Sequence, residues 1–292
     1  MNRNVRRVCG AAVVAAILVA AGALHAQNER TRAAWNQPQK PFKVFGNTYW
    51  VGTSSLGSVL VTSDAGHVLI DGALPESVPQ IRDHIRELGF KIEDVKLILN
   101  THDHYDHAGG IAELQRVSGA RVAASAPSAA VLKTGMPEAD DPQYGLLPPI
   151  ERVPAVQTIQ NHETLSVGPL RLTAHLTPGH TAGGTSWSWR SCEGTRCLNL
   201  VYADSLSAVS NETFKYTASP LVKALQESFT TLEHLPCDIL LTPHTGFSSI
   251  LEHLAAREAG KVDAFVDARA CKTYVAAMRA NLVKRLNDER GR

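Results

Sequence analysis

The sequence from position 101 to 107 reads Thr101-His102-Asp103-His104-Tyr105-Asp106-His107, which places three histidines and two aspartates within seven residues. The run directly follows the apolar segment Val95-Lys96-Leu97-Ile98-Leu99, which we expect to be a buried strand. Side chains this polar at the end of a buried strand need binding partners. The layout therefore predicts a metal site carried by the end of a strand.

The spacing within the run suggests two ions. His102 and His104 lie two residues apart, so an extended or turning backbone can direct both rings at one ion. Asp106 and His107 can turn toward a second ion close by. Imidazole nitrogens and carboxylate oxygens are donors that suit zinc, so we expect two Zn(II) ions per chain. The alternative is a polar loop with a chance cluster of histidines.

Two later histidines are candidates for the missing ligands of a tetrahedral site. His180 ends Thr177-Pro178-Gly179-His180 after the alternating segment 170–174, and His244 ends Leu240-Leu241-Thr242-Pro243-His244. Both lie just past an expected strand, where an α/β protein gathers its functional loops. We assign the other seven histidines to structure or solvent: His25, His67 (in a turn between two strands), His84, His162, His175, His234 and His253.

These motifs resemble the metallo-β-lactamase superfamily over nearly the whole mature chain, through the HxHxDH run, the PGHT histidine and the TPH histidine. Within it, the segments 202–208 and 235–244 resemble the subclass B3 metallo-β-lactamases. The resemblance implies an α/β fold, an αββα sandwich formed by a single domain. It also implies hydrolysis of the lactam ring of β-lactam antibiotics, carbapenems included, and hence antibiotic resistance.

The resemblance assigns roles to individual residues. The first zinc would be held by His102, His104 and His180, and the second by Asp106, His107 and His244, with a water or hydroxide between them. A bound water or Asp106 would also handle the proton when the lactam nitrogen leaves. Ser205 stands at the position where another subclass has a cysteine ligand.

Four further residues are candidates around the metals. Ser205 and Ser207 are expected to donate hydrogen bonds to the substrate carboxylate, although each could be an ordinary turn serine. Gln143, in the loop 140–144, is a weaker candidate for a contact with the substrate or bound water. Asp71 follows the strand 68–70 and could orient the ligand histidines or the motif loop. A turn-forming role before Gly72 is compatible with that function.

Asp204 supports the main competing interpretation. In glyoxalase II and related hydrolases an aspartate in a similar context bridges both metals, and a bridging Asp204 would suit thioester, lactone or phosphoester substrates. A non-catalytic zinc-binding protein is a third possibility, but six candidate ligands exceed the four donors that a structural zinc needs. The Ser-Leu-Ser pattern at 205–207, Cys237 and the leader favour the lactamase.

The N-terminus predicts export. Arg3, Arg6 and Arg7 precede an apolar stretch from 8 to 24, which is typical of a cleaved signal peptide over residues 1–26. The metallo-β-lactamase domain would then occupy 27–292, with cleavage after Ala23 or Ala26. The apolar stretch is too short and alanine-rich for a stable membrane anchor. We expect a periplasmic monomer.

Composition and charge agree with a secreted single-domain enzyme acting on a small molecule. The chain has 292 residues, of which 44% are hydrophobic and 20% charged, as is ordinary for one sizeable domain. Its formal net charge is +1, and the leader carries three arginines and no acidic residue, so the mature chain is slightly acidic. A basic surface for nucleic acid is therefore not indicated.

Cysteine usage also supports export. Cys9 leaves with the leader, and an even set remains: Cys192, Cys197, Cys237 and Cys271. Four cysteines allow three pairings, which the sequence leaves open. Pairing Cys192 with Cys197 would close a small loop at the expected tip of a hairpin. The family resemblance favours pairing Cys237 with Cys271, which would tie the strand before His244 to the C-terminal helix.

Apolar periodicity places the supporting elements. We expect a β-hairpin over 59–70 broken at 64–66, and helices over 76–88, 111–117 and 221–235. The segment around Trp35 could lie over the mouth of the site, and the segment 125–149 could form its opposite wall.

Overall fold

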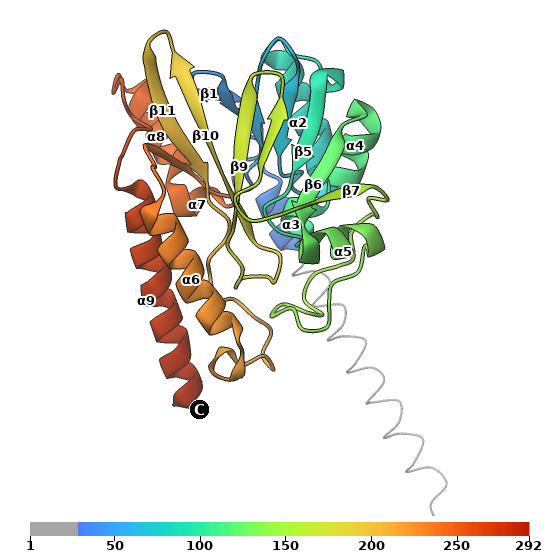
Figure 1. Ribbon diagram of the computed structural model, residues 1–292, viewed down its shortest axis with the longest axis vertical. Helices are drawn as coiled ribbons and strands as arrows, with labels where there is room; N and C mark the ends of the chain where they lie inside the picture. Colours follow the sequence, from blue (N-terminus) through green and yellow to red (C-terminus); the bar gives the residue numbers. More distant parts are fainter. Residues whose placement is uncertain (1–28, 292) are drawn as a thin grey trace, which may run out of the picture.

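The structure is a computed structural model that describes residues 29–291, and its two β-sheets pack face to face with helices on both outer sides (Figure 1). This arrangement confirms the predicted αββα sandwich. The proposed signal peptide, residues 1–26, lies outside the described residues.

The first sheet combines antiparallel and parallel pairing. Its strands are antiparallel from β1 to β4 and parallel from β4 to β7. Since neighbouring parallel strands end at the same edge, the segments that follow β4 and β5 emerge side by side. In sheet order the strands are β1 (Phe42–Phe45), β2 (Thr48–Trp50), β3 (Val59–Val61), β4 (His67–Ile70), β5 (Val95–Leu99), β6 (Arg121–Ser125) and β7 (Val156–Ile159).

The second sheet brings three more strand ends together. Strand β11 runs parallel to β12, and it runs parallel to β9 as well because both are antiparallel to β10 between them. The segments after β9, β11 and β12 therefore leave the sheet at one edge. In sheet order the strands are β12 (Ile239–Leu241), β11 (Arg196–Tyr202), β10 (Thr185–Glu193), β9 (Leu170–Leu176) and β8 (Thr164–Val167).

Helices cover both sheets, with α2, α4 and α5 on one side and α6 and α9 on the other (Figure 1). The α-helices are α2 (Val78–Glu87), α3 (Tyr105–Ala108), α4 (Ile111–Ser118), α5 (Ala126–Thr134), α6 (Leu221–His234), α7 (Thr245–Ser248), α8 (Ile250–Glu258) and α9 (Ala270–Arg290). Short 3-10 helices are η1 (Pro75–Ser77), η2 (Ile92–Asp94) and η3 (Tyr216–Ala218).

Three apolar cores hold these layers together, and strand alternation assigns side chains to them. Leu97 and Leu99 of β5 face the core between the sheets, whereas Ile98 faces the core under α2, α4 and α5. In the other sheet, Tyr202 of β11 faces the inner core and Val201 packs toward α6 and α9. Strands β5 and β6 of the first sheet are buried on both faces, whereas β10 of the second sheet carries Ser188 and the exposed Arg190 on its outer face.

Two hydrogen bonds join the start of the histidine-rich segment to the second sheet. The backbone N–H of Thr185 donates to the carbonyl of Thr101 over 2.8 Å, and the indole N–H of Trp187 donates to the carbonyl of Asn100 over 3.1 Å. Both acceptors follow β5, and both donors belong to β10. The loop after β5 is thus fixed between the two sheets, close to the loops that follow β9 and β11.

Most of the expected elements occur, with two differences. The hairpin β3–β4 turns at 64–66, but His67 is the first residue of β4 rather than part of the turn. The expected helix over 76–88 is divided into η1 and α2. Pro79 lies in the first turn of α2, where proline is tolerated because its missing N–H is not needed, so the regular helix begins at Val78.

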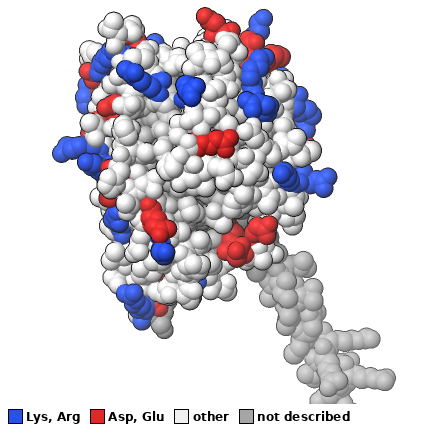
Figure 2. Space-filling view, in the orientation of Figure 1, with Lys and Arg blue, Asp and Glu red and all other residues white. Residues whose placement is uncertain are grey.

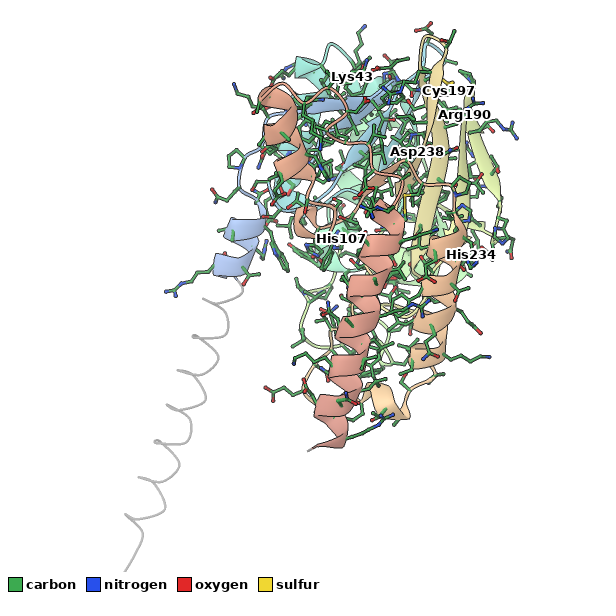
Figure 3. All side chains as sticks on the ribbon, turned by 90° about the vertical axis from the view of Figure 1, so that its left-hand side faces the viewer. Lys43, His107, Arg190, Cys197, His234 and Asp238 are labelled. Carbon is green, nitrogen blue, oxygen red and sulfur yellow. A yellow bond between two sulfur atoms is a disulfide. The ribbon has the colours of Figure 1, made fainter. Side chains whose placement is uncertain are left out.

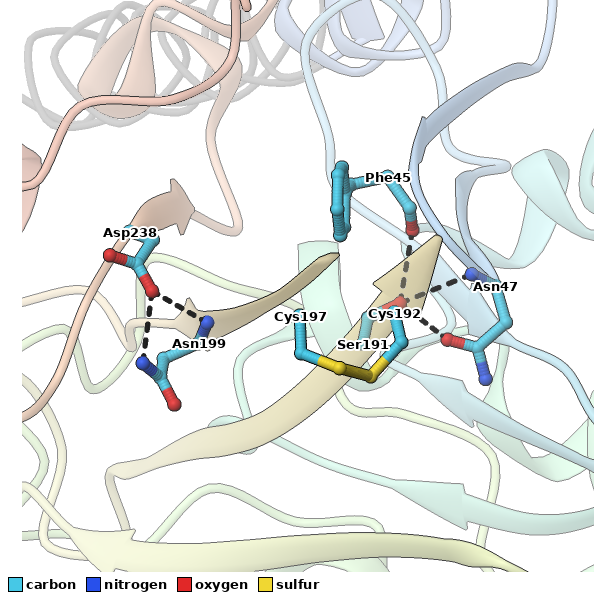
Figure 4. Close-up of a disulfide and its surroundings, with 7 residues drawn as sticks. All are labelled: Phe45, Asn47, Ser191, Cys192, Cys197, Asn199 and Asp238. Carbon is cyan, nitrogen blue, oxygen red and sulfur yellow. Dashed lines mark hydrogen bonds between the residues drawn. A yellow bond between two sulfur atoms is a disulfide. The ribbon is translucent and has the colours of Figure 1, made fainter. Parts of the chain in front are cut away.

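Two disulfides join the four remaining cysteines. Cys192 pairs with Cys197 at the tip of the β10–β11 hairpin (Figure 4), and Cys237 pairs with Cys271 of α9. Beside the first bond, the Ser191 hydroxyl donates to Asn47 Oδ1 over 2.6 Å and fixes the hairpin tip to the first sheet. Figure 3 shows Cys197 far along the sheet from His107, so this disulfide is remote from the histidine-rich segment.

The surface carries both signs of charge. On the face shown in Figure 2, basic and acidic side chains are scattered among neutral ones. Within residues 29–291, no helix combines the length and the apolar character that a membrane span requires.

Candidate metal centre

The ends of β5 and β9 bring three imidazoles together. His102 and His104 follow β5, and His180 follows β9. The ring centroids lie 4.9 Å apart for each of the three pairs, so the rings surround a common point. All three residues are buried, and one nitrogen of each lies within 4.8 Å of the others. This is the set that the sequence predicted for the first ion.

Hydrogen bonds on the outer side of these rings leave one nitrogen of each facing inward. His102 Nδ1 donates to Asp204 Oδ1 over 2.7 Å, and His180 Nδ1 donates to the Ser207 carbonyl over 2.8 Å. In both rings Nε2 therefore keeps its lone pair. Nε2 of His102 is fully buried and has no hydrogen-bond partner among residues 29–291. A buried polar atom of this kind is what a metal ion would satisfy.

A second group of donors adjoins the first. Asp106 and His107 lie on the short helix α3, and His244 follows β12. Asp106 Oδ2, His107 Nε2 and His244 Nε2 form a triangle with edges of 3.2, 3.3 and 3.2 Å. Tetrahedral zinc with bonds of about 2.0–2.1 Å would separate neighbouring donors by about 3.3–3.4 Å. The second triangle thus fits one face of a zinc tetrahedron.

Electrostatics favour the donor forms of most of these groups. Burial holds the pKa of His102 well below its usual value and lowers that of His180 to about 3. Burial also lowers the pKa of His107, against the attraction of Asp106. For Asp106 burial raises the pKa, but the neighbouring His107 and His244 hold it well below its usual range. Neutral imidazoles and an ionised carboxylate are the forms that bind metals.

His104 is the exception among the ligand candidates. Burial lowers its pKa, but the hydrogen bond and the charge of Asp141 outweigh burial and raise it. Asp141 lies against His104 Nε2, whereas Nδ1 of His104 lies on the side of the Gln143 amide, which also contacts His180 Nε2. Sequence reasoning missed Asp141, because an aspartate before a proline in a loop is typical of a turn.

The two candidate aspartates outside the ligand groups have different partners. Asp71 lies after β4 and accepts hydrogen bonds from the backbone N–H and the hydroxyl of Thr101, over 2.8 and 2.7 Å. It therefore holds the start of the motif loop rather than a ligand ring. Asp204 belongs to neither donor group and contacts the outer nitrogen of His102. This position argues against the metal-bridging role that the sequence left open.

A cavity of about 340 Å³ opens beside both donor groups. Trp35 lies at one wall, with its ring centroid 5.9 Å from that of His244. The Ser205 hydroxyl is buried and has no hydrogen-bond partner among the residues that the structure describes. The Gln143 amide lies 3.3 Å from His104 Nδ1 and 3.4 Å from His180 Nε2. The residues lining the cavity are Trp35, His104, Asp106, His107, Gln143, Leu147, His180, Ser205, Ser207, Val209, His244 and Phe247.

Comparisons with known proteins agree with this geometry. The model of the metallo-beta-lactamase superfamily matches residues 57–193. The solved structure of the Rm3 metallo-beta-lactamase is 54% identical with a TM-score of 0.87, covering 89% of this chain and 98% of that one. MEM-A1, a subclass B3 metallo-beta-lactamase isolated from a soil metagenome library, is 47% identical with a TM-score of 0.86, covering 88% and 99%.

Curated relatives match a smaller part of the chain. A probable hydroxyacylglutathione hydrolase, glo2 of Schizosaccharomyces pombe, is 44% identical over 64 residues, which are 21% of this chain and 24% of that protein. The probable polyketide biosynthesis zinc-dependent hydrolase PksB of Bacillus subtilis is 32% identical over 91 residues, which are 31% and 33%. The chain thus spans a third or less of the length of these relatives.

A two-sheet sandwich with two buried groups of histidine and aspartate donors at one edge defines a metal-dependent hydrolase of this fold. The chain belongs to the metallo-β-lactamase superfamily and, within it, to the subclass B3 metallo-β-lactamases.

Proposed function

We propose that this protein is a zinc-dependent β-lactamase that hydrolyses the lactam ring of β-lactam antibiotics, carbapenems included, and thereby confers resistance. The observation that carries the proposal is the pair of adjoining donor triangles, which open into one cavity. The 54% and 47% identity to two metallo-beta-lactamases over nearly their whole length supports the same activity.

The donor chemistry supports two zinc ions. His102, His104 and His180 would hold the first, and Asp106, His107 and His244 the second. Zinc bound there would supply Lewis acidity and an activated water at neutral pH. Each group offers three protein donors, which leaves a coordination position open to solvent or substrate, as catalytic zinc sites require.

The chain's own residues would bind the substrate and handle the proton. Asp106 would pass a proton to the leaving nitrogen, because its carboxylate lines the cavity that would hold the substrate. The Ser205 hydroxyl, which has no hydrogen-bond partner in the described part of the chain, can donate to the substrate carboxylate, and Ser207 lines the same cavity. Gln143 would contact the substrate from the opposite loop.

A thioester or lactone hydrolase of glyoxalase II type is less well supported. The observation that favours this activity most is the set of short sequence matches to hydroxyacylglutathione hydrolases. Asp204, which would have to bridge the metals, instead accepts a hydrogen bond from the outer nitrogen of His102. We therefore treat thioester or lactone hydrolysis only as an alternative outcome of the substrate test described below.

We further propose that residues 27–292 form the mature domain and that it works as a periplasmic monomer. The two disulfides support an oxidising compartment, because such bonds persist in exported proteins. The partner would be a small molecule, without a nucleic acid or a stable membrane anchor.

The test is hydrolysis of a carbapenem, a cephalosporin and a penicillin by the purified mature protein, followed by ultraviolet absorbance. We expect turnover that a chelator abolishes and added zinc restores. In parallel, His180→Ala should lose metal and turnover, whereas the exposed His234→Ala on α6 (labelled in Figure 3) should keep both. If zinc-loaded protein leaves all three substrates intact, the lactamase proposal is wrong, and thioesters and lactones become the substrates to assay.

A further inference from the structure

Asp141 lies against one ligand histidine from a distant loop. Its two carboxylate oxygens are 3.2 and 3.1 Å from His104 Nε2. The side chains of His104 and Asp141 are only 7% and 9% exposed, so water screens the pair weakly. The backbone N–H of Gln143 also donates to Asp141 Oδ1, over 2.7 Å, and holds the carboxylate in this orientation.

This contact decides which nitrogen His104 presents to a metal. An ionised carboxylate only accepts hydrogen bonds, so in the neutral ring His104 Nε2 carries the hydrogen and Nδ1 keeps the lone pair. His102 and His180 have the opposite arrangement, because their Nδ1 atoms are the ones that donate. His104 thus differs from the other two rings in the nitrogen that has an outer partner, and Asp141 is that partner.

The loop that carries Asp141 is itself fixed by Asn211. The backbone N–H of Asn211 donates to the Pro142 carbonyl over 2.7 Å, and its side-chain amide donates to the Tyr144 carbonyl over 3.0 Å. The Asn211 side-chain oxygen accepts from the backbone N–H groups of Thr213 and Phe214. Asn211 thus connects the loop 140–144 to the loop 210–214.

Helix α9 supports the second of these loops. Arg285 donates to the Ser210 hydroxyl over 2.6 Å and to the Phe214 carbonyl over 3.2 Å. The Cys237–Cys271 disulfide fastens the start of α9 to the segment that leads into β12. A continuous series of contacts therefore leads from α9 through Asn211 to Asp141 and His104.

We propose that Asp141 is a positioning residue of the first metal site: it fixes His104 with Nδ1 as the donor atom, and Asn211 holds the Asp141 loop in the position that this requires. The proposal rests on the metal centre of the proposed function but not on the identity of the substrate.

Four variants separate position from charge. Asp141→Ala removes the acceptor, and Asp141→Asn removes the charge but keeps an oxygen that can accept from Nε2. The matched control is Asp140→Asn, which removes the same charge from the adjacent, exposed residue. Asn211→Ala releases the loop without changing the Asp141–His104 pair itself.

Zinc affinity is measured by competition with a chromophoric chelator, and the His104 tautomer in the metal-free protein by long-range ¹H–¹⁵N NMR of ¹⁵N-histidine-labelled samples. We expect Asp141→Ala to weaken one of two zinc equivalents by about 10- to 100-fold, which is usual when a hydrogen-bond partner of a ligand histidine is lost. It should also lose the Nε2–H signature of His104. Asp141→Asn and Asn211→Ala should weaken the same equivalent less, and Asp140→Asn should match the wild type.

Thermal unfolding of each variant verifies that it is folded before its zinc affinity is compared. Wild-type affinity and tautomer in Asp141→Ala would overturn the proposal. An equal loss in Asp140→Asn would also overturn it, because the effect would then be that of charge alone. A wild-type protein that binds two zinc ions but hydrolyses no lactam would contradict the proposed function and leave this inference standing.

Discussion

Asp204 Oδ1 and His102 Nδ1 form a hydrogen bond of 2.7 Å between two side chains that are both 0% exposed. The carboxylate reaches the outer side of the ring and so directs Nε2 toward the other ligand candidates. Gly184 makes this possible, since a Cβ there would lie 2.4 Å from Asp204 Oδ2. Asp204 therefore orients a ligand, and neither donor group includes its carboxylate.

This relationship predicts different outcomes for two Asp204 variants. Asp204→Asn keeps an oxygen that can accept from His102, so we expect it to bind both zinc ions with at most about a 10-fold loss at the first site. Asp204→Ala should weaken the first site further. Metal content and chelator competition measure both. If Asp204→Asn loses a metal altogether, the carboxylate acts as a ligand and the bridging interpretation returns.

Replacing Asp71 should change the stability of the fold rather than the orientation of a ligand histidine. Asp71→Ala leaves the Thr101 N–H and hydroxyl without their acceptor in the interior, and an unsatisfied buried donor costs about 1–3 kcal/mol. Its positive φ of 62° adds backbone strain for alanine but is tolerated by asparagine. We expect Asp71→Ala to lower the free energy of unfolding in urea by more than Asp71→Asn.

The exposed Asp64 in the β3–β4 turn provides the control for that measurement. Asp64→Ala should change the free energy of unfolding by less than about 0.5 kcal/mol. A small effect of Asp71→Ala, comparable with the control, would mean that water replaces the carboxylate and that the loop does not depend on it.

The lowered pKa of Glu289 should make the stability of the fold depend on pH. Burial raises its pKa, but hydrogen bonds from the Thr217 backbone and Arg285 outweigh burial and lower the pKa to about 2. A carboxylate with a lowered pKa stabilises the fold above its unfolded pKa of about 4.3, and this contribution is lost as the pH falls toward 2. Glu289→Gln should therefore lower the melting temperature at pH 7 and approach the wild type near pH 2–3.

The control for this profile is Glu227→Gln on α6, where the side chain is 67% exposed and pairs with Lys223. Its melting temperature should follow the wild type at every pH, because exposed ion pairs contribute little. A difference between Glu289→Gln and wild type that stays constant down to pH 2 would contradict the assigned pKa.

The two disulfides should differ in their contribution to stability. The Cys237–Cys271 bond spans 34 residues and the Cys192–Cys197 bond only 5. In the chain-entropy model the longer loop is worth about 3–4 kcal/mol and the shorter about 2 kcal/mol. We expect the double alanine variant at 237 and 271 to lose more free energy of unfolding in urea. Equal losses would show that loop length does not determine their contributions.

Local sequence patterns predicted the elements that depend on near neighbours. Apolar alternation and the turn residues at 64–66 gave the β3–β4 hairpin, and helical spacing gave α4 and α6 within a residue. Pro79 is also visible in the sequence, but the predicted helix over 76–88 began two residues before the observed start of α2 at Val78. The segment 125–149 was expected to form a wall of the site, but its conformation was not predicted. That conformation depends on a contact with Asn211, far along the chain.

The sequence by itself determined which residues could bind metal, because strand ends and the spacing of the HxHxDH run are local properties. Only the tertiary structure decided how the donors are oriented. The partner that directs His102 lies 102 residues away, that of His104 lies 37 away and that of His180 lies 27 away. A ring presents Nδ1 or Nε2 according to the hydrogen bond made by its other nitrogen. That bond exists only once both sheets and their loops have packed together.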